Sequence, residues 1–200
     1  MRQYTITKVT GKPDWSKIPS LDVDNYQWCE ELDIKMKSQI CYDENGLYVH
    51  LRAWEKDIRA ELTEPMSMVC EDSCMEFFFR PMEGDLRYFN LEINPNGCIR
   101  LGFGPAGGLR TQLVPRDMEQ LFSVESRRTE DGWTLTYAIP LTFVQLFYPD
   151  FYFRPGTVLR GNCYKCGDLT VQPHYYSWNP VEVENPDFHR SEFFGKLYFE

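Results

Sequence analysis

Residues 34–54 have the sequence IKMKSQICYDENGLYVHLRAW, and this stretch decides the fold class. Hydrophobic and polar residues alternate over 34–42 and again over 47–54, which is the period of a β-strand with one buried face. Asn45-Gly46, between the two runs, tolerates the positive φ that a tight reversal needs, so the stretch predicts a β-hairpin. On the second arm Leu47, Val49, Leu51 and Ala53 share the core face, and Tyr48, His50, Arg52 and Trp54 share the other.

Similar short runs follow along the rest of the chain, separated by turn residues such as Asn94-Pro95-Asn96-Gly97 and Glu130-Asp131-Gly132. The further predicted strands are 74–80, 87–94, 98–102, 122–128, 133–139, 157–166 and 193–199. One short helix is predicted near Leu141–Phe147, after Pro140, and the Gly- and Pro-containing residues 103–118 are predicted to form a long loop. Many short strands without an internal repeat or linker predict an all-β protein. We expect one domain over residues 1–200, a jelly-roll- or immunoglobulin-like antiparallel β-sandwich.

Composition excludes several classes of function. The chain has 200 residues, 21 basic and 30 acidic side chains and a formal net charge of −9. This charge opposes binding to nucleic acid and to anionic membranes, and no apolar run is long enough to span a bilayer. Oligomeric state is left open by the sequence.

The amino-terminal residues Met1–Ile6 lack the apolar segment of a signal peptide, so we expect a cytoplasmic location unless a leader has been removed. Seven cysteines, an odd number, are then expected to be free and largely buried thiols. Cys163 and Cys166 have C-x-x-C spacing, but in a strand they would project to opposite faces, which favours a packing role.

A polar and aromatic sheet face is the feature that bears most directly on function. Over 88–94, Tyr88, Asn90, Glu92 and Asn94 alternate with apolar residues, and over 158–164 Arg160, Asn162 and Tyr164 do likewise. Sugar hydroxyls need such donors and acceptors, and the C–H face of a pyranose packs on an aromatic ring. A solvated outer sheet with scattered aromatic residues would give the same alternation.

The sequence resembles family 9 carbohydrate-binding modules and their DOMON-like relatives. The similarity runs in order through Gly11–Trp15, Ile18-Pro19, Tyr42–Val49, Glu71–Phe79, Gly132–Pro140, Arg160–Asp168, Ser177–Pro180 and Phe188–Leu197. The resemblance implies a β-sandwich that binds mono- or oligosaccharide units, such as glycan ends, without catalysis. A role in glycan degradation or uptake would follow.

The resemblance also implies the site. The family's acidic residue after an Asp-Ser pair matches Glu76, its middle-strand Arg falls near Asn90, and its Gln falls at Lys165. Of the two tryptophans that clamp the sugar in the family, one falls at or next to Cys70 and the other at Phe188. Trp54 and Trp178 are candidate replacements from neighbouring positions. The predicted carbohydrate-binding residues are Trp54, Glu76, Asn90, Glu92, Arg160, Asn162, Lys165, Trp178 and Phe188, with Arg52 in support.

Other functions stay open at this point. Glu76 and Glu92, on strands predicted to be adjacent, could serve a glycoside hydrolase as acid and base. Some DOMON-like relatives carry haem, for which His50, His174, Met68 and Met75 are candidate axial ligands. The same face could also bind a protein. We expect no cofactor, although Asp22–Asn25 and Asp43–Asn45 contain oxygen ligands of the kind that calcium uses.

Overall fold

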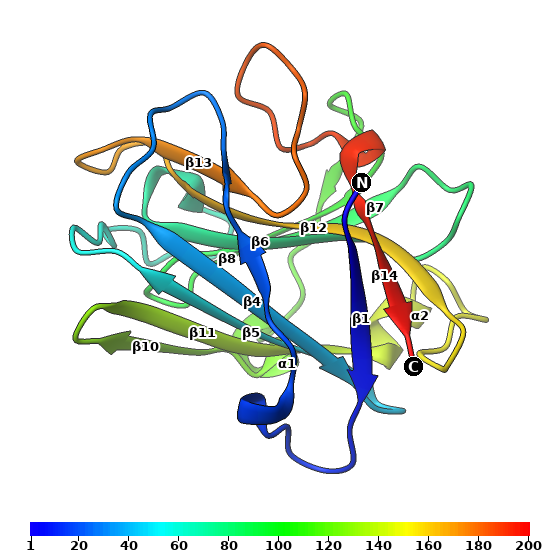
Figure 1. Cartoon of the computed structure of the whole chain (residues 1–200). Helices are drawn as coiled ribbons and strands as arrows, with labels where there is room; N and C mark the ends of the chain where they lie inside the picture. Colours follow the sequence, from blue (N-terminus) through cyan, green and yellow to red (C-terminus); the bar gives the residue numbers. More distant parts are fainter.

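A computed structural model describes residues 1–200 as two packed β-sheets (Figure 1). The first, here called the hairpin sheet, has the order β10, β11, β5, β4 and β2, all antiparallel. Its strands are β10 (Glu125–Thr129), β11 (Gly132–Pro140), β5 (Gly46–Trp54), β4 (Lys35–Tyr42) and β2 (Leu21–Val23). The predicted hairpin of residues 34–54 is therefore confirmed as β4 and β5.

The second sheet, here called the opposite sheet, has the order β14, β12, β6, β7, β8 and β9, with β13 and β3 added beside β12. Its strands are β14 (Gly195–Phe199), β12 (Val158–Gly167), β6 (Cys74–Arg80), β7 (Tyr88–Ile93), β8 (Ile99–Gly104), β9 (Thr111–Gln112), β13 (His174–Ser177) and β3 (Asn25–Tyr26). β1 (Gln3–Lys8) joins the sheets because its first four residues pair in parallel with β14 and its last two with β4. Figure 1 shows β1 in dark blue beside β14 in red.

The apolar residues of both sheets meet between them in one core of 37 buried side chains. The alternation of β5 is observed as expected, because Leu47, Val49, Leu51 and Ala53 are all fully buried in this core. On β6, Phe77 and Phe79 face the same core and Glu76 faces away from it. The predicted all-β sandwich is confirmed, with β1 as the strand that pairs in parallel.

The outer face of the opposite sheet is itself largely covered. Residues 178–194 cross it, and Val181 and Phe194 pack there against Phe78, Tyr88 and Tyr164 in a second, smaller apolar cluster. This cover explains why β6 and β7 are buried on both faces. Polar residues of these strands are thereby enclosed instead of lying on an open sheet surface.

The helical segments are all short: α1 (Met118–Phe122), α2 (Leu141–Gln145), and the 3-10 turns η1 (Trp15–Lys17), η2 (Val69–Glu71) and η3 (Ser191–Phe193). α2 matches the predicted helix, whereas α1 was not predicted. Because α1 extends to Phe122, the strand predicted to begin at residue 122 begins at Glu125 instead, as β10. No helix is long and apolar enough to cross a membrane.

Candidate functional site

A cleft of about 360 Å³ opens on the outer face of the opposite sheet, at the end that residues 178–194 leave partly uncovered. Its floor carries Glu76 of β6 and Glu92 of β7, which are directly paired across the two strands and are both buried. Strand alternation puts both side chains on the face opposite the core. Asn90, two residues before Glu92 on the same face, donates from Nδ2 to Glu92 Oε1 over 2.8 Å.

Aromatic side chains form one wall of this cleft. Phe188 stacks on Tyr164, with ring centroids 4.1 Å apart and planes inclined by 15°. Trp28 and Tyr175 pack against the other edges of the Phe188 ring, at 5.6 and 6.3 Å. Trp28 is held by its indole N–H, which donates to the Val183 carbonyl over 2.8 Å. Phe188, Trp28 and Tyr175 are half-buried, so each keeps part of its surface available in the cleft.

Two arginines and a histidine also line the cleft, together with Asp168 and Asp187. Arg110, from the loop before β9, donates from Nη1 to Asn90 Oδ1 over 2.8 Å and from Nη2 to His189 Nε2 over 2.9 Å. Arg100 of β8 is paired in register with Glu92 and places its Nε 4.0 Å from Glu92 Oε2. A hydrogen-bonded chain therefore runs from Arg110 through Asn90 to Glu92, and it fixes the side chains of the floor.

Burial dominates the electrostatics of the cleft. It raises the pKa of Glu76 well above its usual range, and the neighbouring charge of Glu92 raises it further. Burial likewise raises the pKa of Glu92 to about 7, although Arg100 and Arg110 oppose the shift. The pKa of His189 is lowered to about 3 by burial and by the same two arginines, so this imidazole is neutral at physiological pH.

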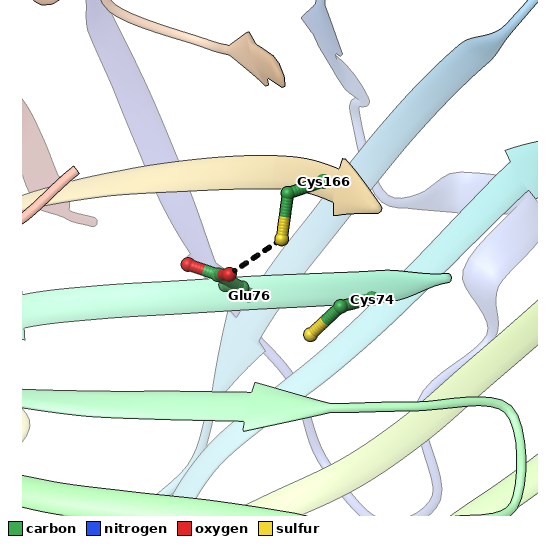
Figure 2. A group of neighbouring side chains, drawn as sticks. All are labelled: Cys74, Glu76 and Cys166. Carbon is green, nitrogen blue, oxygen red and sulfur yellow. Dashed lines mark hydrogen bonds between the residues drawn. The ribbon is translucent and has the colours of Figure 1, made fainter. Parts of the chain in front are cut away.

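A group of thiols lies at one end of the floor (Figure 2). Cys166 of β12 donates from its thiol to Glu76 Oε1 over 3.0 Å, and Cys74 lies beside it on β6. Cys70 is half-buried in the wall of the same cleft. All seven cysteines of the chain are free thiols, as expected, and five of them are buried.

Of the nine residues predicted from the sequence, the structure brings four together at this cleft. Glu76, Glu92 and Phe188 line it, and Asn90 lies beneath, hydrogen-bonded to Glu92 and Arg110. The other five lie elsewhere in the fold.

Trp54 and Trp178 do not reach the cleft. Trp54 is the last residue of β5, on the outer face of the hairpin sheet, where the guanidinium carbon of Arg52 lies 4.7 Å from its ring centroid. Trp178 is buried in the core between the sheets and packs over Gly195. The ring beside Glu76 is instead that of Phe188, with Trp28.

Asn162 and Arg160 lie in the first half of β12, where both side chains contact other parts of the fold. Asn162 is fully buried and anchors residues 178–194, since its Nδ2 donates to the Asn179 carbonyl and its Oδ1 accepts from the Asn179 N–H. Arg160 lies four residues from the position paired with Glu76, about 13 Å along the strand. Its guanidinium contacts Met1 Sδ (2.7 Å) and Glu83 Oε1 (3.8 Å).

Lys165 faces the interior of the sandwich, on the opposite side of β12 from the cleft. Its ammonium nitrogen lies 3.2 Å from Glu55 Oε2 and 2.6 Å from His174 Nε2, and all three residues are buried. Ser73 and Trp133 donate two further hydrogen bonds to Glu55. Lys165 therefore belongs to a buried charge network that joins β12 and β13 to the end of β5.

The residues that sequence reasoning missed come mostly from loops. Trp28 and His189 were not among the predicted site residues, and Arg110 lies in the long loop predicted over 103–118. Arg100 is the exception, because its alternation in β8 opposite Glu92 would have placed it on this face.

The candidate haem ligands and calcium turns are dispersed. Met75 is in the core, His174 is in the Lys165 network, His50 stacks on Trp15 on the hairpin sheet, and Met68 is at the cleft rim. Asp43 caps its own turn by accepting from the Asn45 and Gly46 N–H groups. Asp22 and Asp24 pair with Lys37 and Arg2.

A larger hollow, of about 640 Å³, lies beside β2, β4 and the end of β5, with Trp54 in its lining. Its acidic and basic residues, such as Asp33, Lys35 and Asp131, are exposed, apart from the buried Glu55, whose carboxylate is already held by Lys165, Ser73 and Trp133. Buried polar groups that converge on a hollow are what distinguish a built binding site. The smaller cleft has such groups, because the buried side chains of Glu76 and Glu92 both point into it.

The profile of carbohydrate-binding family 9 matches residues 6–199, which is nearly the whole chain. The chain belongs to carbohydrate-binding family 9. This confirms the resemblance drawn from the sequence, and it supports non-catalytic carbohydrate binding as the function of this family 9 chain. No curated protein matches its sequence.

Solved structures agree with the family 9 fold. A candidate carbohydrate-binding protein from Bacteroides uniformis superposes with a TM-score of 0.86 at 26% identity, covering 100% of this chain and 99% of that one. A family 9 module from Caldicellulosiruptor kristjanssonii in complex with glucose gives a TM-score of 0.70 at 12% identity, over 100% and 96% of the two chains. A family 9 module from the same organism in complex with cellotriose gives a TM-score of 0.68 at 12% identity. The match covers 100% of this chain and 94% of that one. Because these last two structures share only 12% sequence identity with this chain, they support the fold alone.

Proposed function

We propose that the cleft over Glu76 and Glu92 is the saccharide-binding site of this family 9 chain and takes the terminal unit of a glycan. The observation that carries the proposal is the convergence of buried carboxylates, arginines and an aromatic wall on one hollow of about 360 Å³. That volume is at the small end for ligand sites, which suits one or two sugar rings.

The chemistry of the lining matches that of a pyranose. Carboxyl oxygens of Glu76 and Glu92 accept hydrogen bonds from sugar hydroxyls, a proton retained by the pair can be donated to a hydroxyl oxygen, and the arginine N–H groups donate likewise. Phe188 and Trp28 offer apolar ring surface to the C–H groups of the sugar. A buried carboxylate gains a strong hydrogen bond from a hydroxyl, because the surrounding medium screens it poorly.

The site is rigid before ligand binds. Glu76 and Asn90 are held on paired strands, Asn90 is fixed at both ends of its amide, and Phe188 is stacked on Tyr164. Binding therefore needs little ordering of side chains, which preserves affinity for a small ligand. Both carboxylates rise side by side from adjacent strands of one floor, whereas a glycosidase places its two carboxyl groups on either side of the scissile bond.

A glycan array followed by titration calorimetry tests this proposal. Glucose and cellotriose are the first ligands to try, since they are the ligands of the two Caldicellulosiruptor structures. We expect Glu92→Gln and Arg110→Ala to weaken binding of the array's best ligand by at least about tenfold, as loss of a charged hydrogen bond does. Glu83→Gln, at an exposed carboxylate outside the cleft, is the matched control. Unchanged affinity in both cleft variants would refute the assignment of the site.

A further inference from the structure

Two thiols and a carboxylate form a compact group at the floor of the cleft, which Glu76 and Cys166 line and beneath which Cys74 is buried. Cys74 and Cys166 are direct cross-strand partners on β6 and β12, and Glu76 lies two residues along β6 on the same face. The ligand atoms of all three side chains lie within 4.8 Å of one another, and all three residues are buried (Figure 2). We propose that Cys74, Cys166 and Glu76 bind a borderline-soft divalent cation of the Zn²⁺ type.

The donor set determines which cations fit. Zn²⁺ binds thiolate sulfur at about 2.3 Å and carboxylate oxygen at about 2.0–2.2 Å, usually in a tetrahedron. Such a tetrahedron separates its ligand atoms by roughly 3.3–3.8 Å, which small side-chain rotations would reach from the observed spacing. Ca²⁺ and Mg²⁺ select oxygen ligands, so two sulfurs among three donors disfavour them.

The present hydrogen bonds leave these donors available to a cation. The Cys166 thiol donates to Glu76 Oε1 over 3.0 Å, so a cation that takes the place of its proton would need the sulfur and the oxygen to move apart. Cys74 makes a long contact, 3.9 Å from sulfur to the Met75 carbonyl, and its thiol lies against that of Cys166. Cys166 and Glu76 line the cleft, which gives the cation a path from solvent to the buried Cys74.

Cation binding at Cys74, Cys166 and Glu76 changes the protonation and the net charge of this group. Binding of the cation releases the two thiol protons to solvent, and a third proton where the Glu76 carboxyl is protonated. Burial raises the pKa of both thiols, but a coordinated divalent cation deprotonates a thiol outright. Two thiolates, one carboxylate and the cation sum to one negative charge. Arg100 and Arg110 in the same cleft oppose this charge, whereas Glu92 and Asp168 add to it. Cys166 and Glu76 line the cleft, so water from the cleft would supply a fourth ligand.

This inference does not rest on the proposed sugar function, because metal binding is measured without saccharide. The experiment adds Co²⁺ to the full-length, fully reduced chain and follows the near-ultraviolet thiolate-to-cobalt charge-transfer absorption, and then displaces Co²⁺ with Zn²⁺. We expect one equivalent of Co²⁺ to produce the band and Zn²⁺ to abolish it. Cys41→Ser, at a buried thiol of β4 on the hairpin sheet, is the matched control and should leave the titration unchanged.

Three variants decide the result. Cys74→Ser and Cys166→Ser, tested separately, should each weaken Co²⁺ binding and diminish the charge-transfer band. Glu76→Gln keeps both thiols and should weaken affinity by at least the roughly 10–100-fold known for loss of an outer-shell partner. Circular dichroism checks the fold of each variant. Absence of the band in the reduced wild-type chain, or an undiminished band in folded Cys74→Ser or Cys166→Ser, would overturn the proposal.

Discussion

Glu76 and Glu92 are directly opposite each other on β6 and β7, on the same face, with about 3% and 4% of their surfaces exposed. Two buried carboxylates at this spacing resist ionising together, because each charge is poorly hydrated and repels the other. Burial accordingly raises the pKa of both side chains, to about 7 for Glu92. The floor of the cleft thus retains a proton up to a pH at which ordinary carboxyl groups are ionised.

The pH dependence of stability should reveal this proton. A carboxyl whose pKa is higher in the folded than in the unfolded chain stabilises the fold at low pH, and that stability is lost as pH rises through the folded value. Between about pH 8 and about pH 5, the wild-type chain should therefore gain on the order of 1–3 kcal/mol relative to Glu92→Gln. Urea unfolding of both chains across this range measures the difference. A stability difference that is constant with pH would contradict the shifted pKa.

Gly102 of β8 lies against Asn90, and a side chain there should disturb the floor. Gly102 is paired in register with Asn90, and a Cβ atom at residue 102 would overlap Asn90 Oδ1, which accepts the hydrogen bond from Arg110. Gly102→Ala should therefore displace the amide and weaken saccharide binding by about 1–2 kcal/mol. Calorimetry on Gly102→Ala, Asn90→Ala and the double variant tests the mechanism. Fully additive losses of binding free energy would show that Gly102 acts by another route.

The buried Lys165 is expected to support the fold and not the cleft. Burial alone would raise the pKa of Glu55, but Lys165, Ser73, His174 and Trp133 together lower it, so its carboxylate is charged and needs the lysine. Lys165→Met should destabilise the chain by about 3–5 kcal/mol, because it leaves this carboxylate buried and uncompensated. Denaturant unfolding measures the loss, and adding Glu55→Gln to Lys165→Met should recover part of it. If Lys165→Met lowers the free energy of unfolding by less than about 1 kcal/mol, Lys165 does not compensate the charge of Glu55 as we expect.

Much of the fold could be predicted from alternation. The β4–β5 hairpin and the strands β6, β7, β8, β11 and β12 lie within a few residues of their predicted bounds. The strands that were missed, β1, β2, β3, β9 and β13, are short or pair with strands distant in sequence. Their local sequence does little to specify these strands, because tertiary contacts determine how they pair.

The candidate site could be predicted only in part, for a physical reason. Alternation places Glu76, Asn90 and Glu92 on the same face, but it does not say which part of that face residues 178–194 will cover. Trp54 follows the same alternation and yet lies on the other sheet. Trp28, Arg110 and His189 reach the cleft from loops, whose positions depend on the whole fold and not on a local period.

The choice of aromatic ring separates this account from the alternative that Trp54 binds the sugar. Titration calorimetry with the best saccharide ligand should compare Phe188→Ala and Trp54→Ala with the wild-type chain. Phe188 faces the cleft and Trp54 is on the hairpin sheet. We predict that Phe188→Ala weakens binding by about 1–3 kcal/mol, the range for an aromatic stacking platform, and that Trp54→Ala leaves affinity unchanged. Loss of binding in Trp54→Ala together with full affinity in Phe188→Ala would contradict the assignment of the cleft over Glu76 and Glu92.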